Sequence, residues 1–119
     1  AGRRQVLNLG HTFGHAWESL QMHKGEPVPH GRAVVQGLHL ALMLSDLQTE
    51  HKMLSRIYPW KYVDKSELDA LWELQLGDKK NENGEVKFVL LNGIGKPYWD
   101  ATIDRSNWEA AINLLNTHG

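Results

Sequence analysis

Apolar residues recur every three to four positions along two stretches in the first half of the chain, as they do in amphipathic helices. The first stretch covers residues 5 to about 22, and the second covers residues 30 to about 50. Pro27 and Pro29 stiffen the loop between them, so the second helix is predicted to begin at His30. Its buried stripe is predicted to consist of Val34, Val35, Leu38, Leu42 and Met43.

Shorter elements follow in the second half. One helical segment is predicted to end at Ile57, and another to start at Ser66. The inward positions of the latter are predicted to be Glu67, Leu68 and residues 71–74. Residues 85–91 have strand character, and after two glycine turns residues 98–103 are expected to pair back as a hairpin. A final helix should start at Ser106, with a core face of Trp108, Ala111, Ile112 and Leu115. The pattern predicts a mainly α fold with a small β-hairpin.

Composition narrows the class of protein. A chain of 119 residues can bury one modest core, so one compact domain is expected. The absence of cysteine excludes disulfides and thiolate zinc sites, which leaves histidine and carboxylate as the strong metal ligands. A net charge of −1 without a basic stripe argues against nucleic acid as the partner. No membrane span or signal peptide is evident, so we expect a soluble, cytoplasmic protein with a small-molecule site.

The run Leu-Asn-Leu-Gly-His-Thr-Phe-Gly-His-Ala-Trp-Glu at residues 7–18 is the most informative segment. Gly10 and Gly14 fall within the predicted first helix, where each disfavours helix by about 1 kcal/mol relative to alanine. Glycines four residues apart share one helical face and permit close approach of a ligand or another backbone. His11 and His15 lie on the adjacent stripe. One interpretation is close helix packing beside surface histidines, and the other is a metal and proton-transfer centre.

A wider pattern favours the second interpretation. It reads Arg4-x-x-x-Asn8-x-Gly10-His11-x-x-Gly14-His15-x-x-Glu18, followed by His30-Gly31-x-Ala33-Val34. This pattern resembles the 3-dehydroquinate synthase family, and Asp78-Lys79-Lys80 and Gly93-Ile94-Gly95-Lys96 follow in the order found in that family's C-terminal part. Two features depart from the family: Arg32 stands where an acidic residue is usual, and the segment between about residues 48 and 78 is shorter. The resemblance implies that residues 1–119 are a C-terminal helical domain, a fragment without the N-terminal NAD-binding domain.

The resemblance implies that His11 and His30 bind zinc, with a third ligand, a glutamate, upstream of this chain. Two histidines and a distant carboxylate leave coordination open for water or substrate, as in catalytic zinc sites. Cobalt stays open as an alternative metal. Glu18 is interpreted as support for the helix or for a ligand. The remaining histidines are interpreted as surface or packing residues: His23, His39, His51 and His118.

The same resemblance assigns roles to residues around the metal. It implies that His15 acts in proton transfer and that Arg4 and Asn8 bind substrate. On sequence alone, the lysine pair that follows Asp78 is a charged turn. The resemblance instead implies a contact with the substrate's phosphate, for which Lys80 is favoured and Lys79 comes second.

For the intact enzyme the resemblance implies conversion of 3-deoxy-D-arabino-heptulosonate 7-phosphate into 3-dehydroquinate and phosphate, a step of the shikimate pathway. Tightly bound NAD serves a transient oxidation in that family, and a homodimer is expected. The chain has no glycine-rich strand-turn-helix fingerprint for NAD, so we expect it to be inactive alone. Two alternatives stay open: a sister sugar-phosphate cyclase with related chemistry, and a helical metal-binding or interaction module without catalysis.

Overall fold

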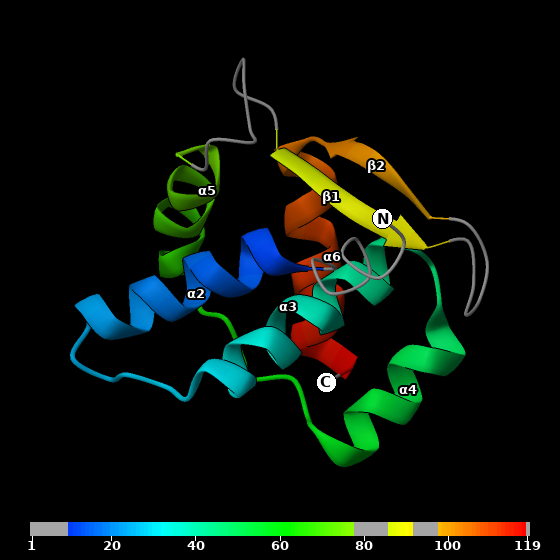
Figure 1. Ribbon diagram of the computed structural model, residues 1–119, viewed down its shortest axis with the longest axis horizontal. Helices are drawn as coiled ribbons and strands as arrows, with labels where there is room; N and C mark the ends of the chain where they lie inside the picture. Colours follow the sequence, from blue (N-terminus) through cyan, green and yellow to red (C-terminus); the bar gives the residue numbers. More distant parts are fainter. Residues whose placement is uncertain (1–9, 78–85, 92–97, 119) are drawn as a thin grey trace.

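The computed structural model describes residues 10–77, 86–91 and 98–118 (Figure 1). Its elements are α2 (His11–His23), α3 (His30–Leu44), α4 (Gln48–Ile57), the short 3-10 helix η1 (Lys65–Glu67), α5 (Leu68–Leu76), β1 (Val86–Leu91), β2 (Tyr98–Ile103) and α6 (Arg105–His118). The predicted mainly α fold with one hairpin is confirmed. None of the helices within the described ranges is long and apolar enough to cross a membrane.

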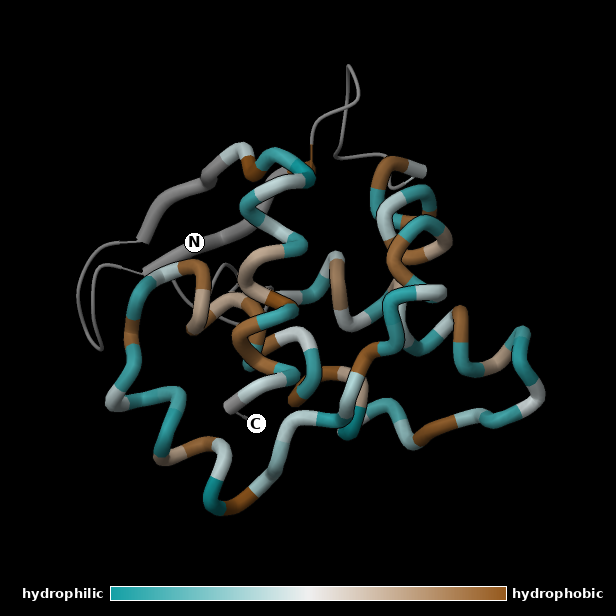
Figure 2. The backbone as a smooth tube through the Cα atoms, turned by 180° about the vertical axis from the view of Figure 1, so that it is seen from behind, coloured by the Kyte–Doolittle hydropathy of each residue, from teal (hydrophilic) through white to brown (hydrophobic). Residues whose placement is uncertain are grey.

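Helix α3 is the central element. It packs against α2, α4, α6 and strand β1, while α5 covers the other side of α2 (Figure 1). Brown apolar positions alternate with teal polar ones along the helices, as amphipathic packing requires (Figure 2). The largest fully buried side chains include Phe13 and Trp17 of α2, Leu40 of α3 and Leu71 of α5. The core therefore lies where helices from both halves of the chain meet.

Four tryptophans belong to this core and are at most 7% exposed: Trp17, Trp60, Trp72 and Trp108. Trp72 and Trp108 are in ring contact, with centroids 5.1 Å apart. All four tryptophans are therefore packing groups of the core. The predicted core face of α6 is confirmed too, because Trp108, Ala111, Ile112 and Leu115 are all buried.

Close approach of α2 and α3 depends on glycine. A Cβ on Gly37 would lie 2.1 Å from the carbonyl oxygen of Gly10, and one on Gly14 would lie 2.6 Å from that of Ala33. Gly10 caps α2 in a left-handed conformation, with φ 71°. The prediction that Gly10 lies inside a helix is therefore wrong, because this backbone conformation starts a helix rather than continuing one. Residues 5–9 lie outside the described residues.

The long second helix was predicted to reach about residue 50, and this boundary is wrong. Helix α3 ends at Leu44, and Asp46 takes a positive φ of 59°. Backbone hydrogen bonds from Ser45, Asp46 and Leu47 to carbonyls of the last turn close the helix. Helix α4 then runs to Ile57, as predicted.

Side-chain exposure corrects the predicted buried stripes at three positions. Val34 is 44% exposed, because the buried face of α3 runs instead through Ala33, Gln36 and Leu40. On α5, Glu73 and Leu74 are exposed, since four consecutive helical positions cannot all face one core.

The hairpin pairs Val86 with Ile103 and Leu91 with Tyr98 in an antiparallel register. The prediction of two strands that pair as a hairpin is thereby confirmed, while the predicted glycine turns lie outside the described residues. Helix α6 follows the hairpin at once and starts one residue before the predicted Ser106, where the Asp104 side chain accepts a hydrogen bond from the Asn107 backbone N–H at 2.8 Å. The hairpin thus leads directly into a core helix.

Candidate metal and proton-transfer site

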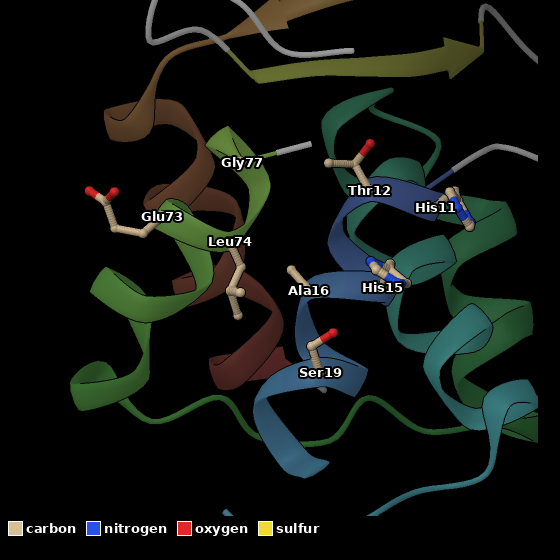
Figure 3. Close-up of a pocket in the computed structure, with 8 residues that line it drawn as sticks. All are labelled: His11, Thr12, His15, Ala16, Ser19, Glu73, Leu74 and Gly77. Atoms are coloured by element: carbon tan, nitrogen blue, oxygen red, sulfur yellow. The ribbon is translucent and has the colours of Figure 1, made fainter. Parts of the chain in front are cut away.

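Two of the motif histidines lie one turn apart at the start of α2. His11 and His15 are exposed, their ring centroids are 6.0 Å apart and their planes differ by 27°. Figure 3 shows both rings projecting from the same side of the helix. Phe13, on the opposite side of the helix, is buried, so packing of α2 fixes which way the two histidines point. The predicted shared stripe for these histidines is confirmed.

The two histidines line a cavity of about 460 Å³ between α2 and α5. Its remaining lining residues are Thr12, Ala16 and Ser19 from α2, and Glu73, Leu74 and Gly77 from α5 (Figure 3). The cavity combines imidazoles, hydroxyls and an apolar wall, so it can hold a small polar molecule against histidine.

The third motif histidine opens α3, as predicted. His30 is the first residue of the helix, and Pro29 precedes it in an extended conformation. The Nδ1 atom of His30 lies 3.2 Å from Oε1 and 3.4 Å from Oε2 of Glu18 on α2. The side chain of His30 is 70% exposed and that of Glu18 is 20% exposed. The interpretation of Glu18 as a support for a ligand therefore has a direct contact behind it.

The contact between Glu18 and His30 leaves one nitrogen of His30 suited to binding zinc. A carboxylate only accepts hydrogen bonds, so the Glu18 contact requires a proton on Nδ1 and leaves Nε2 of neutral His30 with a free lone pair. Carboxylate contacts of this kind orient metal-binding histidines. Within the described ranges no group of three or more histidine or carboxylate side chains could hold a metal ion. His30 does not line the cavity that holds His11 and His15, so the described residues do not assemble a complete metal site.

The four predicted substrate-binding residues, Arg4, Asn8, Lys79 and Lys80, lie outside the described residues. Their neighbours in the chain are informative nevertheless. Gly77, two residues before Lys79, lines the same cavity as the α2 histidines. The described segment 10–77 therefore ends at this cavity.

Two other histidines form a buried contact that spacing alone did not reveal. His39 Nδ1 of α3 lies 3.0 Å from His51 Nε2 of α4, and His39 Nε2 lies 2.6 Å from the carbonyl oxygen of Tyr58. Burial lowers the pKa of His39 to about 4 and also lowers that of His51. The interpretation of both as packing residues is confirmed, and His23 is exposed as expected. The side chain of His118 lies outside the described residues.

Polar residues of α3 also hold the segment after α4. Arg32 donates to the carbonyl oxygen of Pro59 at 2.7 Å. The Gln36 side chain donates to the carbonyl oxygen of Lys61 at 2.7 Å and accepts from its N–H at 3.1 Å. Arg32, the departure from the family pattern, thus has a structural contact in this chain.

The comparison with known families agrees with this geometry. The model described as the C-terminal domain of 3-dehydroquinate synthase matches residues 1–81, which hold all three motif histidines. The chain belongs to the 3-dehydroquinate synthase family. The predicted resemblance is thereby confirmed.

Curated relatives carry the same name. The 3-dehydroquinate synthase of Parabacteroides distasonis is 40% identical over 108 residues, which are 79% of this chain and 29% of that protein. The one from Staphylococcus saprophyticus is 36% identical over 124 residues, covering 97% of this chain and 33% of that protein. The chain thus spans about a third of the length of these 3-dehydroquinate synthases.

A solved structure shows the same fold. The crystal structure of 2-deoxy-scyllo-inosose synthase superposes with a TM-score of 0.60 at 20% sequence identity, covering 90% of this chain and 31% of that one. At this identity the likeness concerns the fold alone.

Proposed function

We propose that this chain is the metal- and substrate-binding domain of a 3-dehydroquinate synthase, which converts 3-deoxy-D-arabino-heptulosonate 7-phosphate into 3-dehydroquinate and phosphate. The shared cavity carries the proposal. His11 and His15 line it together with Gly77, the last described residue before Lys79 and Lys80. The proposed metal donor His11 and the proposed proton-transfer group His15 therefore share one cavity.

The protein's own residues have distinct tasks in this reaction. His15, exposed in the cavity, exchanges protons with the substrate, a task for which imidazole is suited near neutral pH. Lys80, with Lys79 as the second candidate, pairs with the phosphate, whose negative charge grows as its bond to carbon breaks. Arg4 and Asn8 hold the substrate's carboxylate and hydroxyl groups.

His11 and His30 would hold the metal, zinc or cobalt, with a carboxylate supplied from outside this chain. When bound, the metal polarises a substrate hydroxyl and NAD serves as a reversible hydride acceptor. NAD would be bound by a separate N-terminal domain, in a cytoplasmic protein that forms a homodimer. The chain alone is therefore expected to be inactive.

A sister sugar-phosphate cyclase is the nearer alternative. The fold does not distinguish the two, since it resembles that of 2-deoxy-scyllo-inosose synthase. The names of the curated relatives at 36–40% identity favour dehydroquinate synthase. A helical metal-binding or interaction module without catalysis is the second alternative, and the names of the same curated relatives argue against it.

The deciding experiment measures phosphate release from the heptulosonate by the complete protein with zinc and NAD, alongside zinc binding by calorimetry. We expect His15→Ala to lower the turnover number by about 100- to 10,000-fold while zinc binding persists. We expect His11→Ala to lower both. His23→Ala, at the exposed end of α2, is the matched control and should change neither.

Each alternative has its own outcome. Release of phosphate from another sugar phosphate, but not from the heptulosonate, would assign the chain to a sister cyclase. No release from any of these substrates, with zinc binding indifferent to His11, would favour the non-catalytic module.

A further inference from the structure

We propose that Glu18 is a positioning residue that holds the ring of His30 with its proton on Nδ1 and so reserves Nε2 for a metal ion. The inference rests on the proposed function, because that function supplies the metal. It goes beyond the ligands themselves, since Glu18 would act through His30 rather than bind the ion.

The contact has the geometry of an orienting hydrogen bond. Both oxygens of Glu18 face the same ring atom, at 3.2 and 3.4 Å from Nδ1 of His30. The carboxylate is largely covered, with 20% of its side chain exposed, while 70% of the imidazole side chain is exposed. The more covered partner therefore anchors the more open one and directs the rest of the ring outward.

The two side chains meet because of how the helices pack. Glu18 lies on α2 seven residues after His11 and three after His15, on the same helical side. The tight contact of Gly14 with the Ala33 carbonyl brings the first turn of α3 beside this part of α2. His30 begins that turn, so the close packing at Gly14 brings His30 within hydrogen-bond distance of Glu18.

Without an acceptor at Nδ1, a neutral imidazole can carry its proton on either nitrogen. A ring at the exposed start of a helix is also free to rotate. A proton on Nε2 would block the donor that a metal needs, so fixing the tautomer increases metal affinity. Removal of such orienting partners typically weakens metal binding about 10- to 100-fold.

A merely structural role predicts something different. Because 70% of the His30 side chain is exposed, the pair contributes little to folding stability, so its loss should leave the melting temperature nearly unchanged. Tautomer and metal affinity are therefore the informative readouts, and stability is the check that the variants fold.

The test uses the complete protein stripped of metal and labelled with ¹⁵N-histidine. Long-range ¹H–¹⁵N spectra at pH 8 should show His30 protonated on Nδ1, and Glu18→Ala should abolish that preference. Glu18→Gln keeps an acceptor oxygen and should retain the tautomer in part. Glu26→Ala, which removes the same charge from the exposed loop before His30, is the matched control.

Zinc titration of the same variants completes the test. We expect Glu18→Ala to weaken zinc about 10- to 100-fold, Glu18→Gln to lie between it and the parent, and Glu26→Ala to match the parent. An unchanged His30 tautomer or unchanged zinc affinity in Glu18→Ala would overturn the inference. If the tautomer and affinity change as expected while the protein releases no phosphate, the proposed function fails and the role of Glu18 stands.

Discussion

The buried His39 should make the folded state sensitive to mild acid. Its Nε2 donates to the Tyr58 carbonyl, so its Nδ1 accepts the hydrogen bond from Nε2–H of His51. A second proton on His39 would point at that N–H. The positive charge of Arg32, on the same helix, also opposes protonation, and the Trp60 ring packs against the His39 ring with 5.9 Å between centroids. The folded chain therefore keeps His39 neutral.

The magnitude follows from the pKa of His39, which burial lowers from 6.5 to about 4. The unfolded chain takes up the proton first as the pH falls below 6.5, so stability is fully present above that value and decreases toward pH 4. Each pH unit in this window is worth about 1.4 kcal/mol. Stability should fall by about 2 kcal/mol between pH 8 and pH 5, and by about 3 kcal/mol once the pH is below 4.

Urea unfolding followed by circular dichroism from pH 8 to pH 4.5 measures this loss. His39→Gln keeps a donor for the Tyr58 carbonyl but cannot titrate. It should be less stable than the parent at pH 8, yet lose about 2 kcal/mol less on going to pH 5. His23→Gln, exposed at the end of α2, should follow the parent at every pH. Parallel curves for His39→Gln and the parent would refute the reasoning.

Two further substitutions test the packing. Gly37→Ala places a Cβ 2.1 Å from a backbone oxygen of α2 and should destabilise the fold by about 1–3 kcal/mol in urea unfolding, whereas Gly31→Ala, with open space around it, should have little effect. Asn116→Ala removes the acceptor of the Trp60 indole N–H, 2.8 Å away, and should lower stability by about 1–3 kcal/mol, while the exposed Asn113→Ala should not. A similar melting temperature for each substitution and its control would contradict the respective contact.

The order and type of the elements could be predicted from the sequence because periodicity reports which face of a segment is buried. In α6 the four predicted core positions are all buried, since their spacing admits only one inward face. The hairpin was equally clear, because glycine turns separate its two strand patterns.

The break between α3 and α4 was not predictable in the same way. Neither glycine nor proline marks it, and an aspartate takes the left-handed conformation instead. Tertiary packing stabilises the left-handed conformation of Asp46, because α4 folds back onto α3 and buries His51 against His39. A local pattern cannot report a contact that exists only after the chain has turned.

The candidate site residues came from the resemblance to the family, and the sequence did not indicate their partners. Spacing indicated that Glu18 supports a helix or a ligand, and the structure shows that it contacts His30. The sequence did not explain why Arg32 stands where the family usually has an acidic residue. In the structure Arg32 donates to the backbone carbonyl of Pro59. Contacts to backbone atoms leave no trace in side-chain patterns, so they are the part of a site that sequence reasoning misses.

The sequence allowed two interpretations of the histidine motif and its glycines: close helix packing, or a metal and proton-transfer centre. In the structure, the helix packing positions the residues on which the proposed chemistry depends. Gly10 and Gly14 meet the backbone of α3 on one side of α2, while His11 and His15 project into the cavity on another. The same close contact brings His30 within reach of Glu18. A larger residue at Gly14 should therefore disturb the His30 tautomer as well as stability, although Gly14 does not line the cavity.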